Sequence, residues 1–355
     1  MFAPHFLIFV VLIPAWASPT AKKPWLSSKR PFKEAATPPS FQSQVIYQSP
    51  TSLFLENIAV RASSDLLLTS VASPNLFTLD PSTINGTLNT VHIFPNATSL
   101  TGIAEYRPDV FALASSVVNV TTRRAAPDST VIWSIDFTSN AQSPVVRALA
   151  RLPGAASANG LSAIPGLPDI LLAADSDAGA VWQIDASTGT TRLVVQDASM
   201  LANAPPPALG INGLHIAPAA PKLLYFANSG QGTISRLALQ IDKGNASVSP
   251  AGAVQTLASI QPAGAQQAPD DFALDPAGRG AWVAVHPGAL VLLSPPSPGN
   301  ANGNWTQVTA VGNSQGSDKG MMQPTSAAIG RGKQVGSLFV TTGVGQVVMV
   351  ASENF

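Results

Sequence analysis

The pentapeptide Glu56-Asn57-Ile58-Ala59-Val60 is the first of six copies of a short pattern that recurs along the chain. Each copy has a polar residue, in most cases followed by a small one, and then an apolar run. The remaining copies begin at Thr101, Asn159, Asn212, Asp270 and Thr325. Successive copies start 45, 58, 53, 58 and 55 positions apart, a spacing typical of propeller blades and solenoid units.

Every copy leads into further β-strand signals. Two clear examples are the apolar runs at residues 169–174 and 180–184, and those at residues 222–226 and 233–237, each pair joined by a short polar corner. Short runs rich in Val, Ile, Leu and aromatic residues between Gly, Asn, Asp and Pro are typical of strands. No long stretch has the apolar period and the end signals of an α-helix. The sequence therefore predicts an all-β fold.

Six repeats of four strands each predict a six-bladed β-propeller, because radial closure leaves only short sheet edges exposed. The last copy begins at Thr325 and the sequence ends at Phe355, which leaves room for three strands. We expect residues 43–48 to supply the fourth, so that an N-terminal strand completes the last blade. A pair of β-sandwiches is the alternative, but it gives no reason for a sixfold period. The predicted propeller domain spans residues 43–355.

The first residues of the chain predict export. The apolar run at residues 6–14 is too short to cross a bilayer, and Ala15-Trp16-Ala17 has the small-x-small pattern of a signal-peptide cleavage site. We therefore expect a signal peptide at 1–17, a disordered basic and Pro-rich leader at 18–42, and secretion. Five Asn-X-Ser/Thr sequons predict N-glycosylation. Their asparagines are Asn85, Asn96, Asn119, Asn245 and Asn304.

The composition excludes several kinds of site. The chain has no cysteine, which rules out disulfides, thiolate catalysis and Cys-ligated metals. Its 19 basic residues balance its 19 acidic ones, and 11% of all residues are charged. This balance gives no indication of a nucleic-acid partner or of an anionic-membrane surface. We expect a monomer that acts on small molecules.

Propeller geometry predicts where a ligand would bind. If each copy opens the innermost strand of its blade, the first residues of the copies form a ring at one mouth of the central channel. Four of them carry carboxylate or amide oxygens, which suit a hard cation such as Ca²⁺ and suit zinc or copper poorly. These four are Glu56, Asn159, Asn212 and Asp270. The alternative is that the ring residues merely form turns where strands begin, which applies most to Thr101 and Thr325.

Other polar residues at this mouth are candidates for catalysis and substrate binding. The corner between the second and third strands of a blade returns to the same mouth, and His286 is placed at such a corner. His215 is expected to face away from Asn212 and to be packed or hydrogen-bonded. The candidate catalytic residues are His286, Asn212 and Asp175. The candidate substrate-binding residues are Thr101, Asn228, Thr325 and Thr342.

The order of Glu in the first blade, Asn in the third, Asn-Gly in the fourth and Asp in the fifth resembles a known metal site. It is the site of the regucalcin, gluconolactonase and strictosidine-synthase-like superfamily of six-bladed propellers. The resemblance covers residues 45–350. It implies a cation held at the channel mouth, which lactonase members use to polarise an ester carbonyl and activate water.

Two departures separate the chain from the hydrolytic members of that superfamily. Those enzymes have a Gly-Glu-Gly-Pro type opening and an Asp-Gly pair in the fifth blade. Here Leu55-Glu56-Asn57-Ile58 and Asp270-Asp271-Phe272 stand in their place. The signal peptide, the sequons, the lack of Cys and residues 54–81 look most like a secreted fungal branch associated with secondary metabolism. That branch includes hetero-Diels-Alderases that join a tropolone-derived quinone methide to a humulene-type sesquiterpene.

Three functions follow as hypotheses. The resemblance favours a hetero-Diels-Alder cycloaddition in meroterpenoid biosynthesis. Such a reaction requires two partners held in a reactive pose, hydrogen-bond donors to the enone oxygen and an apolar wall, and no cofactor. The second hypothesis is a calcium-dependent lactonase or esterase of the gluconolactonase type. The third is a non-catalytic propeller that binds a small molecule.

Overall fold

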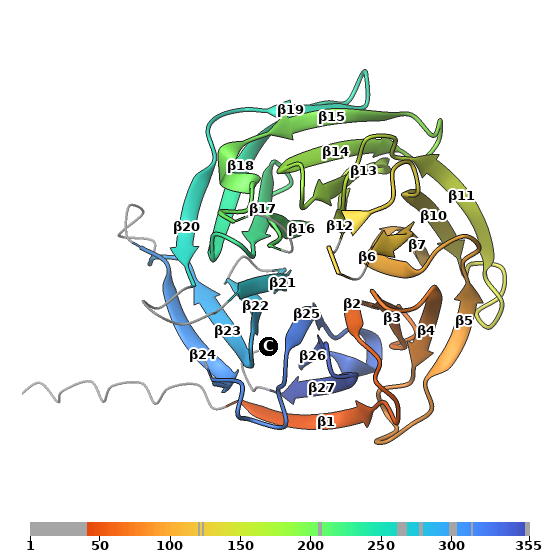
Figure 1. Ribbon diagram of the computed structural model, residues 1–355, viewed down its shortest axis with the longest axis vertical. Coiled ribbons are helices and arrows are strands. Elements are labelled where there is room, and N and C mark those ends of the chain that lie inside the picture. Colours follow the sequence, from red (N-terminus) through yellow and green to blue (C-terminus); the bar gives the residue numbers. More distant parts are fainter. Residues whose placement is uncertain are drawn as a thin grey trace, which may run out of the picture. The chain divides into compact units, whose positions relative to one another are not determined.

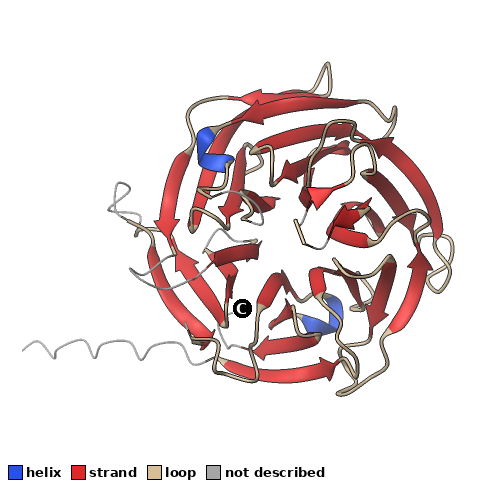
Figure 2. Ribbon diagram, in the orientation of Figure 1, coloured by secondary structure: helices blue, strands red, loops and turns tan. Residues whose placement is uncertain are grey.

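Six antiparallel sheets are arranged radially around a central axis (Figure 1). The computed structural model describes residues 41–119, 121–122, 124–204, 208–260, 268–276, 280–297, 304–313 and 315–351. The predicted signal peptide and the predicted leader up to residue 40 lie outside this part of the chain. Strands dominate, and the helices found here are two 3-10 turns, Ala198–Met200 and Gly332–Gln334 (Figure 2). The predicted all-β, six-bladed propeller is confirmed.

Within the part of the chain that the structure describes, no helix has the length and apolar character needed to cross a bilayer.

Each blade is one sheet, numbered here in chain order by its innermost strand. From the axis outward, blade 1 contains β2 (Leu55–Val60), β3 (Leu66–Ser70), β4 (Asn75–Leu79) and β5 (Asn89–Ile93). Blade 2 contains β6 (Ser99–Arg107), β7 (Val110–Ser116), β10 (Val131–Asp136) and β11 (Val145–Arg151). Blade 3 contains β12 (Ala158–Ile164), β13 (Leu167–Asp175), β14 (Ala180–Asp185) and β15 (Thr191–Gln196). Blade 4 contains β16 (Ile211–Ile216), β17 (Leu223–Asn228), β18 (Thr233–Asp242) and β20 (Gln255–Ser259). Blade 5 contains β21 (Ala268–Leu274), β22 (Ala281–His286), β23 (Ala289–Ser294) and β24 (Thr306–Gly312). Blade 6 contains β25 (Pro324–Ile329), β26 (Ser337–Thr342), β27 (Gln346–Ala351) and β1 (Gln42–Gln48). Additional short strands are β8 (Val118–Asn119), β9 (Arg124–Ala125) and β19 (Ser247–Pro250).

The N-terminal strand β1 closes the ring. It pairs antiparallel with β27, with Gln42 opposite Ala351 and Gln48 opposite Gln346. Ile46 of β1 is buried in the core between blades 6 and 1. The predicted closure is therefore confirmed, with the strand beginning one residue before the expected residue 43.

Apolar clusters hold neighbouring blades together. Among the described residues, one buried cluster lies between each pair of adjacent blades. Between blades 4 and 5, for example, Ile234 and Phe272 belong to the same cluster. Burial of a side chain of this size stabilises the folded state by about 1.5–3 kcal/mol. These clusters fix the inner strands, and hence the polar residues that the inner strands carry.

Each copy of the repeated pattern forms a β-bulge in an inner strand. In blade 4, Ile211 pairs with Asn228 and Leu214 pairs with Phe226, so β16 contains one extra residue. A register shift lies at the same point of every inner strand. A bulge aims side chains in directions that a regular strand does not allow. The polar and small residues of the copies therefore form β-bulges within the inner strands. These bulges were not predicted from the sequence.

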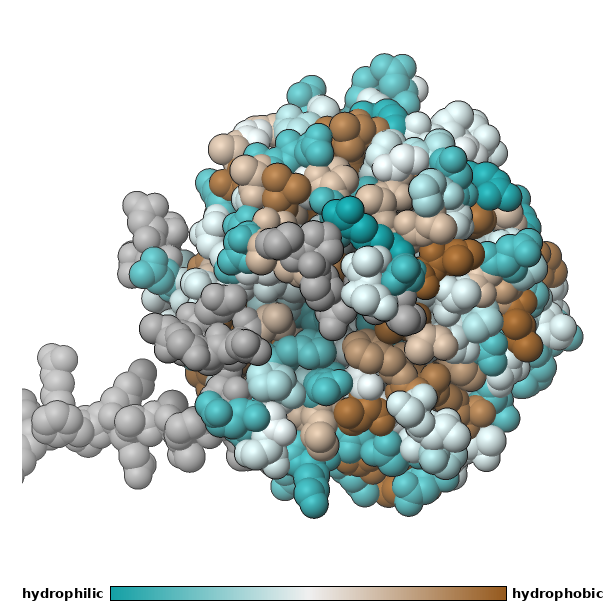
Figure 3. Space-filling model, in the orientation of Figure 1, coloured by the Kyte–Doolittle hydropathy of each residue, from teal (hydrophilic) through white to brown (hydrophobic). Residues whose placement is uncertain are grey.

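The outer surface is mixed in character. On the face shown in Figure 3, hydrophilic and hydrophobic residues are interspersed over the described blades. The asparagines of all five sequons are exposed, as glycan attachment requires. They are Asn85, Asn96, Asn119, Asn245 and Asn304. Glycosylation at these positions stays a prediction.

Candidate functional site

The channel has two distinct mouths. Every blade begins with its inner strand, so the inner strands begin at one mouth, called here the strand-start mouth, and end at the other, called the strand-end mouth. The sequence analysis placed all candidate residues at the strand-start mouth. Polar groups gather there and deeper in the channel, whereas a cavity lies at the strand-end mouth.

Three predicted residues meet at the strand-start mouth. Nδ2 of Asn212 on β16 donates hydrogen bonds to Oδ1 of Asp270 on β21, at 2.5 Å, and to Oγ of Ser229, at 2.9 Å. Nε2 of His286, the last residue of β22, lies 3.1 Å from Oδ2 of Asp270. Burial raises the pKa of the Asp270 carboxyl, and the hydrogen bond and charge of His286 oppose this rise. The predicted convergence of Asn212, Asp270 and His286 is thus present in the fold.

The same mouth offers donor atoms of the kind that Ca²⁺ prefers. Oδ1 of Asn159 is buried and lacks a hydrogen-bond partner in the described part of the chain, and Glu56 is buried on the inner strand of blade 1. Asp270 adds a carboxylate. These oxygen donors fit a hard cation in kind, although His, Asp and Glu side chains do not gather in groups of three or more among the described residues. A cation bound by Asp270 would replace the hydrogen bond from Asn212.

The two threonines of the ring serve the backbone. Oγ1 of Thr101 donates to the carbonyl of Ala158 at 3.0 Å, and Oγ1 of Thr325 donates to the carbonyl of Leu55 at 2.9 Å. Each bond connects the inner strands of neighbouring blades. Thr101 and Thr325 therefore have a structural role, because buried backbone carbonyls need donors, and their predicted role in substrate binding stays a prediction.

The candidates at the corners are likewise engaged by the backbone. Asp175 is fully buried and accepts hydrogen bonds from backbone N–H groups, including those of Ala156 and Ser157. Asn228 donates to the carbonyls of Ser199 and Leu201. Thr342 accepts from the backbone N–H of Gln346 at 2.8 Å. Asp175, Asn228 and Thr342 therefore support neighbouring loops and turns through buried hydrogen bonds, and their predicted catalytic and substrate-binding roles stay predictions.

The second aspartate of the fifth bulge, Asp271, lies at the centre of a buried network. Its Oδ1 is 2.7 Å from Nε2 of His215 and accepts the N–H of Phe272 at 2.8 Å. Its Oδ2 accepts from Nδ2 of Asn57 at 2.8 Å and from Oγ of Ser326 at 3.0 Å. The donors come from blades 1, 4, 5 and 6, so this one carboxylate connects four blades across the channel.

The charge state of Asp271 follows from these donors. Burial alone would raise the pKa of its carboxyl, but the charge that the His215 ring carries when protonated, its hydrogen bond, and the donors Phe272 and Asn57 hold that pKa below its usual value. Gly213 on blade 4 makes the approach possible, since a Cβ there would lie 1.9 Å from Oδ1 of Asp271.

The sequence analysis missed the Asp271 network, although a signal for it was present. At the second position of the copies, blades 2 to 4 have glycine, whereas blades 1, 5 and 6 have Asn57, Asp271 and Ser326. Small residues on one side of the ring leave room for polar side chains that cross from the other. A comparison of second positions would have singled out these three residues.

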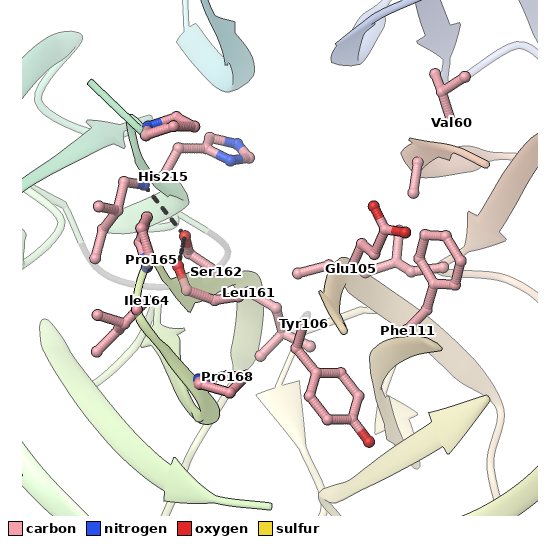
Figure 4. Close-up of a pocket in the computed structure, with 17 residues that line it drawn as sticks. Val60, Glu105, Tyr106, Phe111, Leu161, Ser162, Ile164, Pro165, Pro168 and His215 are labelled. Carbon is pink, nitrogen blue, oxygen red and sulfur yellow. Dashed lines mark hydrogen bonds between the residues drawn. The ribbon is translucent and has the colours of Figure 1, made fainter. Parts of the chain in front are cut away.

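A cavity of about 430 Å³ opens at the strand-end mouth (Figure 4). Most of its lining is apolar and comes from the ends of inner strands in blades 1 to 4. Apolar members of the lining are Val60, Ile103, Leu161, Ile164, Pro165 and Ile216. This size and an apolar lining with few polar groups are typical of small-molecule sites.

Two of the polar side chains that line the cavity are held by neighbours. The carboxylate of Glu105 accepts two hydrogen bonds from Arg331, at 2.6 and 3.0 Å. The hydroxyl of Tyr106 lies 2.9 Å from Oγ of Ser134, outside the lining. The side chains of Glu105 and Tyr106 are therefore already hydrogen-bonded within the protein.

Ser162 and His215 are the remaining polar side chains of the lining. Oγ of Ser162 accepts the N–H of Ile216 and donates to the carbonyl of Ala163, both at 3.2 Å (Figure 4). His215 bonds Asp271 through Nε2, and 29% of its side chain is exposed. His215 was correctly expected to be hydrogen-bonded, but its place in a cavity was not predicted.

A Gly-x-Ser-x-Gly sequence is present at residues 312–316. It follows the last strand of blade 5, and the described residues after it form turns and bends rather than a helix. It is therefore not the strand-turn-helix elbow of a serine hydrolase.

Comparisons with solved structures define the class of protein by its fold. No protein-family model matches the chain. The structure is similar to a calcium-binding regucalcin from Agrobacterium tumefaciens, with a TM-score of 0.57 and 16% identity over 88% of this chain and 95% of that one. It is also similar to a gluconolactonase from Xanthomonas campestris, with a TM-score of 0.55 and 13% identity over 88% and 89% of the two chains. The chain thus has the propeller fold of regucalcin and gluconolactonase.

One relative extends the likeness to sequence. A protein of Phoma sp. named "Putative hetero-Diels-Alderase" is 25% identical over 340 residues, which cover 88% of this chain and 91% of the Phoma protein. The two resemblances expected from the sequence, to the regucalcin-like propellers and to hetero-Diels-Alderases, are both found.

Proposed function

We propose that the protein is an enzyme that catalyses an intermolecular hetero-Diels-Alder cycloaddition between a tropolone-derived quinone methide and a humulene-type sesquiterpene. The likeness to the Phoma protein supports the class of reaction. The observation that carries the proposal is the cavity of about 430 Å³ at the strand-end mouth, where apolar residues and a few polar side chains line the same space. A secreted, glycosylated enzyme of secondary metabolism is part of the same proposal, supported by the exposure of the sequon asparagines.

The cavity residues would act mainly by binding and orienting the two substrates. Ala104, Ala163 and Pro165 are partly exposed apolar residues of the lining and form a wall suited to a sesquiterpene. Holding two partners in a near-attack pose lowers the barrier of a bimolecular reaction by several kcal/mol. A hydrogen-bond donor directed at the heterodiene oxygen stabilises the charge that develops there. No bound cofactor is needed for these steps.

The strand-start mouth favours a second candidate, a calcium-dependent lactonase or esterase. The observation that favours it is the buried Oδ1 of Asn159, which lacks a hydrogen-bond partner in the described part of the chain. Asn159 is on blade 3, and Asn212 and Asp270 are on the next two blades. Glu56, Asn159, Asn212 and Asp270 would hold the ion, which when bound would polarise an ester carbonyl. The regucalcin and gluconolactonase structures support this candidate through their fold alone.

Product analysis separates the two candidates. The purified protein is incubated with a quinone methide precursor plus humulenol, and separately with a panel of lactones, each with and without a chelator. We expect cycloadduct above the uncatalysed background in both chelator conditions. Chelator-sensitive lactone hydrolysis without cycloadduct would reject the proposal, and saturable binding without any product would favour the non-catalytic propeller.

A bulky substitution in the cavity wall serves as the control for location. Ala104 lines the cavity, whereas Ala253 is exposed on the outer surface. Ala104→Trp is expected to reduce cycloadduct formation by roughly a hundredfold, because it removes the space for a reactive pose, while Ala253→Trp leaves the rate unchanged. Equal rates in the two variants would place the reaction elsewhere.

A further inference from the structure

We infer that His215 is the residue of the strand-end cavity that binds an acidic enol or phenol hydroxyl of the substrate through Nδ1, and that Asp271 is its positioning residue. The inference rests on the proposed function for the substrate class, and it adds a catalytic group that neither the fold nor the relatives assign.

The hydrogen bonds of Asp271 determine the tautomer of His215. The two carboxylate oxygens of Asp271 receive the N–H of Phe272, Nδ2 of Asn57 and Oγ of Ser326 as donors. A carboxylate in such surroundings acts as an acceptor, so Nε2 of His215, at 2.7 Å, must carry a proton. In the neutral ring, Nδ1 is then the basic nitrogen.

His215 is also held in orientation. Its ring meets the buried ring of Phe272 edge-on, with centroids 4.8 Å apart and an interplanar angle of 81°. Nε2 is attached to a carboxylate that four blades support, so the ring cannot turn without breaking that bond. A fixed ring with a defined tautomer is how proteins prepare a histidine for proton transfer.

Within the cavity, His215 is the polar side chain left for a ligand. Glu105 is paired with Arg331, and Ser162 is engaged by the backbone of Ile216 and Ala163. Among the described residues, Nδ1 of His215 has no hydrogen-bond partner, whereas 29% of the side chain is exposed. Figure 4 shows the imidazole at the edge of the cavity.

The chemistry of this pair is a single balanced proton transfer. The O–H bond of an acidic hydroxyl breaks, and the proton moves to Nδ1 of His215, while Nε2–H stays bonded to Asp271. The imidazolium that forms lies against the Asp271 carboxylate, which stabilises it. Nδ1–H then donates a charge-assisted hydrogen bond to the oxyanion left on the substrate.

The tautomer and the binding can be tested without turnover. Protein labelled with ¹⁵N-histidine is examined by long-range ¹H–¹⁵N NMR, with tropolone as the probe and His215→Gln for assignment. We expect the Nε2–H tautomer in the free protein and the imidazolium on addition of tropolone. His215→Gln is expected to weaken tropolone binding about tenfold or more, because a charge-assisted hydrogen bond is lost. His92→Gln on the outer strand β5 is the control and should bind tropolone as the wild type does.

Asp271→Asn tests the positioning role. An amide offers either an oxygen or an N–H to the ring, so the tautomer signal of His215 should become mixed and tropolone binding should weaken. If this variant does not fold, Ser326→Ala, which removes one donor to Oδ2, is expected to change the same signal by a smaller amount.

The outcomes distinguish this inference from the proposed function. Tropolone binding that is unchanged in His215→Gln, or an Nδ1–H tautomer in the free protein, would overturn the role of His215 even if cycloadduct forms. Tropolone bound through His215 without any cycloadduct would support the site while rejecting the proposed reaction.

Discussion

Asp270 and Asp271 are consecutive residues of one bulge, yet they belong to different parts of the channel. Asp270 belongs to the strand-start mouth, where Asn212 and His286 are its partners. Asp271 lies in the channel interior and holds His215, which lines the cavity at the other mouth.

Asp270 and Asp271 are both nearly buried, with 8% and 3% of their surface exposed. Burial raises the pKa of Asp270, whereas the pKa of Asp271 is lowered despite burial. Because the two side chains are similarly buried, the larger number of donors around Asp271 accounts for the opposite directions of the two pKa shifts.

The strongest test of this comparison is to remove each carboxylate separately. Asp271→Ala should lower the free energy of unfolding by about 3 kcal/mol or more, because it leaves Asn57, His215 and Ser326 without their common acceptor. Asp270→Asn should change it by less than about 1 kcal/mol, because burial disfavours the charged form of this carboxyl and the substitution removes that charge. Urea denaturation at neutral pH measures both values. A larger loss in Asp270→Asn than in Asp271→Ala would reverse our ranking of the two positions.

A glycine across the channel tests how closely the network is packed. Gly213→Ala should lower the free energy of unfolding by about 1–3 kcal/mol, because the new Cβ would lie 1.9 Å from Oδ1 of Asp271. Gly252 has open space around it and serves as the matched control. Thermal unfolding of both variants provides the comparison. Equal melting temperatures of Gly213→Ala and Gly252→Ala would mean that the network can move aside.

The smallest expected effect is a difference in pH dependence, measured with a chelator present. The lowered pKa of Asp271 contributes stability that is present above pH 3.8 and is lost as the pH falls through the folded-state pKa. The raised pKa of Asp270 contributes stability that is present below pH 3.8 and is lost as the pH rises through the folded-state pKa.

Each aspartate should therefore control a different limb of the stability curve. Asp271→Asn is expected to flatten the loss of stability on the acid side of about pH 4, and Asp270→Asn the loss on the alkaline side, each by at most about 1.4 kcal/mol per pH unit. Urea denaturation between about pH 3 and 7 measures these slopes. If both substitutions flattened the same limb, the opposite directions of the two pKa shifts would be contradicted.

Several features of the site could be predicted because they depend on the repeat alone. A polar residue at the first position of each copy, together with propeller geometry, was enough to bring Asn212, Asp270 and His286 to one mouth. The same reasoning did not show that the side chains of Thr101, Asp175 and Asn228 bind backbone groups. A spacing pattern places a residue near a mouth, but it does not say whether neighbouring carbonyls and N–H groups will take up its side chain.

The strand-end cavity could not be predicted from the repeat in the sequence. It is formed by the ends of inner strands from blades 1 to 4, where Val60, Ile103, Ile164 and Ile216 are ordinary apolar strand residues in the sequence. Nothing local distinguishes an apolar residue that packs in a blade core from one that lines a cavity. The position of His215 beside them depended on the bulge, which turns residues of β16 relative to a regular strand.

The sequence by itself determined the all-β class, the six blades, the closure of the last blade by residues near the N-terminus and the ring of first residues. These follow from periodicity, which is encoded along the chain. Only the tertiary structure decided that each copy is a bulge, that Asp271 rather than Asp270 connects four blades, and that the cavity lies at the opposite mouth from the predicted one. The physical reason is that hydrogen-bond partners and cavities arise between blades, from residues more than fifty positions apart, such as Asn57 and Asp271, which are separated by 214 positions.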